Sequence, residues 1–169
     1  MLDEELVALA RQLQERCLEL GLTVATAESC TGGLVAAAIT AVPGSSGYFR
    51  AGLVTYSDDA KRDFLDVPDA TLTAHGAVSA QTARAMATGA RARIHATMAV
   101  SITGVAGPDG GSAEKPVGLT YVGLAAGDDV EVRKLQLTGD RQENRTEAAR
   151  VALEWLAERA GQAGELTPR

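Results

Sequence analysis

Residues 22–42 read LTVATAESCTGGLVAAAITAV. The first part of this stretch predicts a strand over 22–29. The alanines and other small residues of the second part predict a helix over 31–42 that can pack closely on a sheet. Glu28, Ser29, Thr31 and two glycines lie where the strand gives way to the helix. A strand followed by a closely packed helix indicates the α/β class.

Outward from this unit, helices and strands alternate along the chain. An apolar stripe of helical period predicts a helix from Asp3 to Leu20, which Gly21 can end, and Ser79 can cap a long helix over about 80–95. The other expected elements are strands at 48–57, 97–104, 117–126 and 130–138, a short helix at 58–65 capped by Asp58, loops at 43–47, 67–76 and 104–116, a hairpin turn at 127–129, and a last helix at about 140–160.

This order predicts a three-layer α/β/α sandwich whose sheet is mixed, because the hairpin makes part of it antiparallel. We expect a single domain over residues 1–169, with a core at about 5–160 and a polar tail at 161–169. Ligands of such sheets bind beyond the carboxyl ends of the parallel strands. The three strand-exit segments, TAESCTGG, TYS and TGVAGPDGG, are therefore candidates for one shared crevice.

Composition narrows the classes of protein. With 46% hydrophobic and 22% charged residues and no apolar run of roughly 20 residues, the chain reads as globular and not as a membrane protein. The acidic start MLDEEL and only two cysteines favour a cytoplasmic location over a secreted, disulfide-bonded one. A net charge of −6 argues against direct nucleic-acid binding but leaves a small anionic ligand open.

The turn TAESCTGG offers two interpretations. Ser29, Thr31 and the amides of Gly32 and Gly33 would lie at a helix N-terminus, which favours a phosphate or an oxyanion. Alternatively, a hydroxyl caps the helix and the glycines merely permit the turn. Glu28 is either hydrogen-bonded to the loops or part of the chemistry.

A second cluster follows in GSSGYFRAGLVTYSDDAK, residues 44–61. Ser46 lies in its loop, Tyr56 ends the strand, and Lys61 lies five residues further on. A lysine can act as base for a serine only if its pKa falls towards neutrality. The alternatives are a solvated lysine and a tyrosine ring that packs on the sheet.

The loop GVAGPDGGSAEKP, residues 104–116, matches neither the phosphate loop of nucleotide triphosphatases nor a dinucleotide-binding motif. Its backbone either wraps a ligand or forms a surface excursion. The glycines at issue are Gly104, Gly107, Gly110 and Gly111.

Two arginines and a cysteine complete the candidates. Arg141 and Arg145 lie one turn apart at a helix start, where cations oppose the helix dipole, so an anionic partner or ordinary surface charge explains them. Cys30 beside a helix N-terminus is either a nucleophile or a small buried residue. No histidine shows metal-ligand spacing, so we expect no metal site.

Five segments in order, TAESCTGG, GLVTYSDDAK, HGAVS, SITGVAGPDGGSAEKPVG and GDRQENR, resemble the C-terminal domain of the competence/damage-inducible CinA proteins and its stand-alone form, PncC. The similarity runs from about residue 5 to 160. It implies nicotinamide-nucleotide amidohydrolase activity, in which nicotinamide mononucleotide and water give nicotinate mononucleotide and ammonia, without metal or redox cofactor. The nucleotide-pyrophosphatase domain of longer CinA proteins is missing from this sequence.

The resemblance also implies a serine/lysine/tyrosine amidase. Lys61 would take the proton of the attacking serine, and Tyr56 would orient the lysine or bind the oxyanion. We expect Ser46 to be the nucleophile and keep Ser29 in the site as the other candidate. The groups expected to bind substrate are Thr31, Gly32, Gly33, Gly104, Gly107, Gly110, Gly111, Arg145 and, more weakly, Arg141.

The family name suggests an alternative, a non-catalytic protein acting in competence or DNA repair through a recombination-protein partner. A third hypothesis is hydrolysis of a different nucleotide or amide by the same site. Alanine-rich helix faces at 80–95 and 140–160 would serve either self-association or packing on the sheet.

Overall fold

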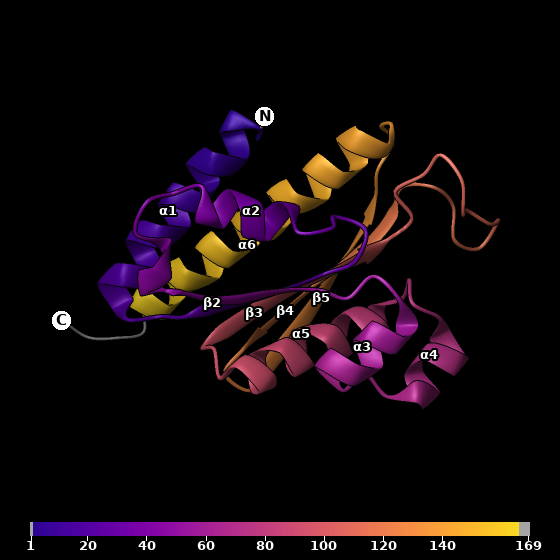
Figure 1. Ribbon diagram of the computed structural model, residues 1–169, viewed down its shortest axis with the longest axis horizontal. Helices are drawn as coiled ribbons and strands as arrows, with labels where there is room; N and C mark the ends of the chain where they lie inside the picture. Colours follow the sequence, from indigo (N-terminus) through magenta and orange to yellow (C-terminus); the bar gives the residue numbers. More distant parts are fainter. Residues whose placement is uncertain (1, 166–169) are drawn as a thin grey trace.

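The computed structural model describes residues 2–165. They form a five-stranded sheet, in the order β2-β1-β3-β4-β5, between two layers of helices (Figure 1). In chain order the elements are α1 (Glu4–Leu20), β1 (Val24–Glu28), α2 (Leu34–Thr40), the 3-10 turn η1 (Ser45–Gly47), β2 (Phe49–Val54), α3 (Asp58–Leu65), α4 (Asp69–His75), α5 (Ala80–Ile94), β3 (Met98–Gly104), β4 (Leu119–Ala126), β5 (Asp129–Gln136) and α6 (Arg141–Glu165).

Strand β1 organises the sheet. All five of its residues are buried, and it pairs in parallel with β2 on one side and β3 on the other. Val24 packs into the core under α1, α2 and α6, whereas Ala25 and Ala27 pack into the core under α3, α4 and α5. A strand buried on both faces needs apolar or small residues throughout, which explains the run VATA.

The helices cover both faces of the sheet. Helices α1, α2 and α6 lie on one face and α3, α4 and α5 on the other (Figure 1). Small residues let these layers approach closely: a Cβ at Gly89 of α5 would overlap the carbonyl oxygen of Leu65 at the end of α3. The predicted three-layer α/β/α sandwich is confirmed.

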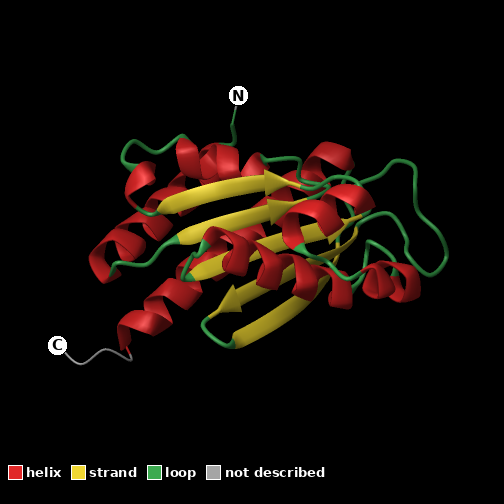
Figure 2. Ribbon diagram, turned by 60° about the horizontal axis from the view of Figure 1, so that its bottom comes forward, coloured by secondary structure: helices red, strands yellow, loops and turns green. Residues whose placement is uncertain are grey.

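The hairpin of β4 and β5 makes the sheet mixed, as predicted, because β4 pairs antiparallel with both β3 and β5. The three parallel strands end at Glu28, Val54 and Gly104, at one edge of the sheet. Figure 2 shows their arrowheads together, with the long loop that follows β3 beyond them. This edge is where the topology predicts a ligand.

Two local predictions are wrong. The N-cap of α3 is Ser57, not Asp58, because the Ser57 hydroxyl accepts from the amide of Ala60 at 3.1 Å. Residues 67–76 are not simply a loop, since α4 forms after Pro68 and buries Leu72 against α5. A proline fits the start of a helix, and one buried leucine suffices to dock so short a helix.

The last helix also differs from its prediction. Helix α6 does not end near residue 160 but continues to Glu165, so the first part of the expected polar tail is helical. Arg16 of α1 donates to the carbonyl of Ala157 at 2.5 Å and thus ties the two helices together there. Residues 166–169 of that tail lie outside the described residues. None of the helices described over residues 2–165 is both long and apolar enough to cross a membrane.

Candidate active site

A crevice of about 280 Å³ opens at the carboxyl edge of the parallel strands. The structure brings Ser29, Tyr56, Lys61 and Arg141 together there. Its full lining is Ser29, Cys30, Tyr56, Lys61, Ala77, Val78, Thr103, Gly104, Val105, Ala106, Gly107, Asp109, Gly110 and Arg141. The three strand-exit segments therefore share one crevice, as the topology predicts.

The ammonium group of Lys61 lies against Ser29 inside the protein. Its Nζ is 3.2 Å from the Ser29 Oγ and donates to the carbonyl of Thr55 at 2.9 Å and of Tyr56 at 3.3 Å. Lys61 is only 1% exposed, and no carboxylate forms an ion pair with it within residues 2–165. Lysine without a carboxylate partner is rarely buried so completely.

Burial lowers the pKa of Lys61 below its ordinary value, and the nearby Asp58 opposes that shift only in part. The Lys61 Nζ donates to the two carbonyls and to the Ser29 Oγ. Once the amine has lost its proton, its lone pair lies beside the Ser29 hydroxyl and can accept the hydroxyl proton. The pair can thus act as a nucleophile and its general base.

Ser46 does not belong to this crevice. It is exposed in the η1 turn before β2, at the amino end of a strand whose carboxyl end leads to Lys61. The six residues of β2 separate the two ends by roughly 20 Å at about 3.3 Å per residue. The expectation that Ser46 is the nucleophile beside Lys61 is wrong, because nearness in sequence was mistaken for the same edge of the sheet.

Tyr56 reaches the crevice in an unexpected way. Its backbone carbonyl accepts from Lys61, while its exposed ring carries the phenolic oxygen to Arg141, whose Nη2 donates to it at 3.2 Å. The phenol therefore does not orient the lysine. Tyr56 and Arg141 form one wall at the mouth of the crevice.

Two amides of the turn TAESCTGG, those of Gly32 and Gly33, are not free for an anion. The buried carboxylate of Glu28 accepts from Gly33 and Val35 at 3.1 Å each and from Ala36 at 2.9 Å. The Gly32 amide donates to the carbonyl of Ser29. The expected cradle at Gly32 and Gly33 is therefore occupied by the protein itself, and Glu28 takes the capping role.

Thr31 and Arg145 also support the turn. Thr31 is fully buried, and its carbonyl accepts from Arg145 Nη2 at 2.9 Å, while the carbonyl of Cys30 accepts from Arg145 Nε at 3.2 Å. Neither Thr31 nor Arg145 lines the crevice. Arg145 holds the segment that carries Ser29 and is not itself free to bind a ligand.

The glycine-rich loop contributes only its first part. Gly104, Gly107 and Gly110 line the crevice, whereas Gly111 lies outside it against Val117. Lys115 anchors the far side of the loop by donating to the carbonyl of His75 at 2.5 Å. This bond holds the loop next to the segment HGAVS, residues 75–79, and Ala77 and Val78 of that segment line the crevice.

The sequence did not single out four positions that the structure places in the crevice wall or behind it: Thr103, Asp109, Ala77 and Asn144. Thr103 lines the crevice and donates to the carbonyl of Ala77 at 2.8 Å. Asn144 is buried and donates to the carbonyl of Ala106 at 3.1 Å. An asparagine one position before Arg145 in a polar helix start gave no signal, since only the fold reveals that it points inwards.

Cys30 lines the crevice beside Ser29 but is poorly suited to attack. Burial raises the pKa of its thiol to about 11, so the reactive thiolate is scarce at neutral pH. The interpretation as a small buried residue holds, and Ser29 is the better nucleophile.

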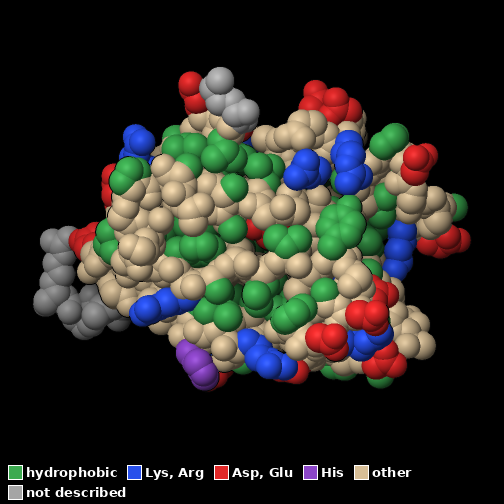
Figure 3. All heavy atoms as spheres, viewed as in Figure 1, with side chains coloured by type: hydrophobic (Ala, Val, Ile, Leu, Met, Phe, Trp, Pro, Cys, Tyr) green, Lys and Arg blue, Asp and Glu red, His purple; other side chains and the backbone are tan. Residues whose placement is uncertain are grey.

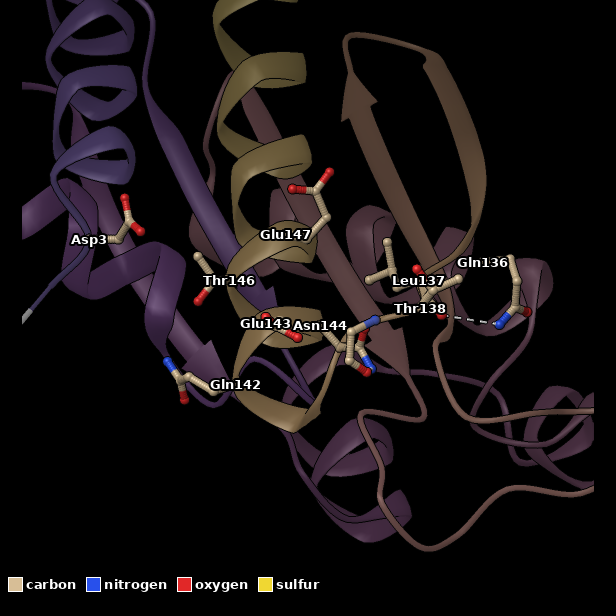
Figure 4. Close-up of a pocket in the computed structure, with 10 residues that line it drawn as sticks. Asp3, Gln136, Leu137, Thr138, Gln142, Glu143, Asn144, Thr146 and Glu147 are labelled. Atoms are coloured by element: carbon tan, nitrogen blue, oxygen red, sulfur yellow. Dashed lines mark hydrogen bonds between the residues drawn. The ribbon is translucent and has the colours of Figure 1, made fainter.

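A larger hollow of about 760 Å³ lies between the start of α1, the end of β5 and the start of α6 (Figure 4). Its acidic side chains are already engaged. Asp3 caps α1 by accepting from the amide of Glu5, Glu143 accepts from the amide of Asp140, and Glu147 pairs with Arg150. This hollow is larger than the crevice, but its acidic side chains already have partners, so we do not take it as the candidate active site.

Comparisons with known proteins show the family of the chain. The model of the CinA C-terminal domain matches residues 6–160. A CinA-like protein of Geobacter sp. (strain M21) is 54% identical over 138 residues, which cover 82% of this chain and 33% of that protein. A CinA-like protein of Geobacter sulfurreducens is 51% identical over 152 residues, 90% of this chain and 36% of that protein. The chain thus spans about a third of these curated relatives.

Solved structures extend the likeness to the fold. The competence/damage inducible protein CihA from Agrobacterium tumefaciens superposes with a TM-score of 0.91 at 48% identity, covering 94% of this chain and 97% of that one. A CinA superfamily protein from Klebsiella pneumoniae gives 0.89 at 34% identity, covering 93% and 98%. On the family model, the identities and these superpositions together, the chain belongs to the CinA C-terminal domain family.

Proposed function

We propose that this protein is an amidohydrolase that converts nicotinamide mononucleotide and water into nicotinate mononucleotide and ammonia. The observation that carries the proposal is the buried amine of Lys61, 3.2 Å from the Ser29 hydroxyl and without a carboxylate partner within residues 2–165. Such an amine is a general base of lowered pKa, and a serine beside it is an activated nucleophile.

The reaction proceeds in two stages. Ser29 Oγ attacks the carboxamide carbon while Lys61 takes the hydroxyl proton, and the carbonyl oxygen becomes negatively charged. The C–N bond then breaks, and Lys61 returns the proton to the departing nitrogen, which leaves as ammonia. Water, deprotonated by Lys61, attacks the ester on Ser29. The bond between the acyl carbon and Ser29 Oγ then breaks, Lys61 returns the proton to Oγ, and the carboxylate product leaves with its own proton lost to solvent.

The shape of the surface suits a nucleotide. A second, largely apolar hollow of about 580 Å³ adjoins the crevice and shares Ala106 and Arg141 with it. In this proposal the carboxamide lies beside Ser29, the ribose lies towards the apolar hollow, and the phosphate stays at the boundary that Arg141 forms between the two spaces. Arg141 is then the cation that meets the phosphate. Figure 3 shows Lys and Arg side chains interspersed with Asp and Glu side chains on the face in view, without a broad basic patch. The attraction of Arg141 for a phosphate would therefore be local.

The test is ammonia release from nicotinamide mononucleotide by the wild type and by Ser29→Ala, Lys61→Ala and Ser46→Ala. We expect the first two variants to lose at least about a hundredfold in turnover. Ser46→Ala is the matched control and should retain wild-type turnover, since Ser46 is exposed at the opposite edge of the sheet. Normal turnover by Lys61→Ala would refute the mechanism.

A panel of other amides and nucleotides belongs in the same assay. Turnover of another amide alone would change the substrate but keep the chemistry. No turnover with any amide would favour a non-catalytic role in competence or DNA repair. Self-association and a recombination-protein partner stay predictions of the sequence.

A further inference from the structure

Asn144 is a buried polar side chain that does not itself line the crevice. It is 3% exposed, and each of its polar atoms is used. Its Oδ1 accepts from the amide of Gly139 at 3.0 Å, while its Nδ2 donates to the carbonyls of Gly139 at 2.9 Å and Ala106 at 3.1 Å. Only this orientation of the amide fits, because the oxygen must face the N–H and the nitrogen the two carbonyls.

The bond to Ala106 fixes a peptide group in the crevice wall. The peptide between Ala106 and Gly107 is trans, so its N–H points opposite to its carbonyl. Since the carbonyl is directed at Asn144 in α6, the Gly107 N–H is directed away from α6. Both residues line the crevice, and the Gly107 N–H has no acceptor within residues 2–165.

One further hydrogen bond and one steric constraint hold this peptide in place. Arg141 Nη1 donates to the Gly107 carbonyl at 2.7 Å, so α6 grips two consecutive carbonyls. Gly107 has a φ of +87°, and a Cβ there would collide with Val117. The loop therefore reaches this arrangement only with glycine at 107, and an unsatisfied N–H is left in a crevice that also holds Ser29.

We infer that Asn144 is a positioning residue that aims the Gly107 amide at the carbonyl oxygen of the substrate, where negative charge develops when Ser29 attacks. The inference rests on the proposed acyl transfer. A preorganised amide donor stabilises the developing oxyanion more than the neutral carbonyl and so lowers the barrier. Asn144 acts through Ala106 and does not touch the substrate.

The test replaces Asn144 by Asp, which keeps the shape and the oxygen that faces Gly139 but replaces the donor to Ala106 with an acceptor. Asn144→Gln, with the same amide on a longer side chain, is the second variant should the acid prevent folding. Thr146→Ala on the same helix is the control. Two activities are measured: turnover of nicotinamide mononucleotide, and acetylation of Ser29 by p-nitrophenyl acetate, which needs an oxyanion donor but no nucleotide.

We expect both Asn144 variants to lower kcat and the rate of Ser29 acetylation by about ten- to a hundredfold, with KM within about twofold and melting curves that show a native fold. The pH at which the activity rises should not move, because Lys61 and Ser29 stay in place. Rates equal to those of Thr146→Ala, or a higher KM at unchanged kcat, would overturn the inference.

The two proposals fail in different ways. If the wild type acetylates Ser29 but releases no ammonia from the nucleotide, the proposed substrate is wrong, and the acetylation rates alone decide the role of Asn144. If the wild type does neither, Ser29 is not an activated nucleophile and both proposals are wrong.

Discussion

Glu28 should be a major stabilising residue of the fold without being a catalytic one. Its carboxylate is 1% exposed and accepts three backbone N–H groups at the start of α2. Glu28→Ala removes all three acceptors, whereas Glu28→Gln keeps one oxygen and turns an NH₂ group towards the remaining amide.

The loss of unfolding free energy can be estimated from the three hydrogen bonds that Glu28 accepts. A hydrogen bond to a charged group contributes about 1.5–3 kcal/mol, and truncation leaves three amides without an acceptor. Because water can enter the space that truncation leaves, we take the lower limit of that range for each of the three bonds and expect Glu28→Ala to lose about 4.5 kcal/mol of unfolding free energy. Glu28→Gln should lose about 2 kcal/mol, for one lost bond and one repulsive contact.

The measurement is urea unfolding followed by circular dichroism, with Asp3→Ala as matched control. Asp3 caps α1 through a single exposed bond of 2.8 Å to Glu5, so its loss should cost only about 1 kcal/mol. If Glu28→Ala were no more destabilised than Asp3→Ala, the capping account would be refuted. A loss of activity in folded Glu28→Gln beyond about tenfold would instead give Glu28 a chemical role.

Three further predictions concern packing, charge and binding. Gly89→Ala should destabilise the protein by about 2 kcal/mol or more in thermal or urea unfolding, because the added Cβ would overlap the Leu65 carbonyl. This loss should outweigh the higher helix propensity of alanine. A stabilised variant would contradict the packing of α5 on α3. The unfolding free energy of the wild type, relative to that of Lys61→Met, should rise with pH between the lowered pKa of Lys61 and its ordinary value near 10.4. In that window the unfolded chain binds more protons than the folded one, and the slope is at most about 1.4 kcal/mol per pH unit. A difference that does not change with pH in urea titrations would contradict this prediction. In steady-state kinetics Arg145→Ala should lower kcat about tenfold at nearly constant KM, because it loosens the turn that carries Ser29. Arg141→Ala should raise KM by about ten- to a hundredfold and also lower kcat, because Arg141 holds the Gly107 carbonyl as well. A KM raised by Arg145→Ala and unchanged by Arg141→Ala would show that Arg145 meets the phosphate.

Much of the fold could be predicted because its signals are local. The stripe of α1, the Ser79 cap of α5 and the hairpin turn at 127–129 each lie within one short segment. The helix α4 was missed because its docking depends on a single leucine, Leu72, whose burial is decided by α5 and not by its own neighbours. The end of α6 was placed too early, and the described contact of this helix with α1 lies at Ala157, before the extra residues.

The site could be predicted only in part, for a different reason. Residues that follow strands were found, because topology alone brings Ser29 and the glycine loop to one edge. The choice between Ser29 and Ser46 was wrong because it needed to know at which end of β2 each lies. The roles of Glu28, Arg145 and Asn144 depend on where long or buried side chains reach in space, and no spacing in the sequence carries that information.

The central claim is that Lys61 is neutral beside Ser29 at the pH of the reaction. It can be measured by NMR titration of the ¹⁵N-labelled lysine amines, which is tractable because the sequence contains only Lys61, Lys115 and Lys134, and Lys61→Met assigns the signal. We predict that the Lys61 amine titrates below the ordinary lysine pKa of about 10.4. A Lys61 pKa at or above that value would contradict the account, because the charged amine could not take the proton of Ser29.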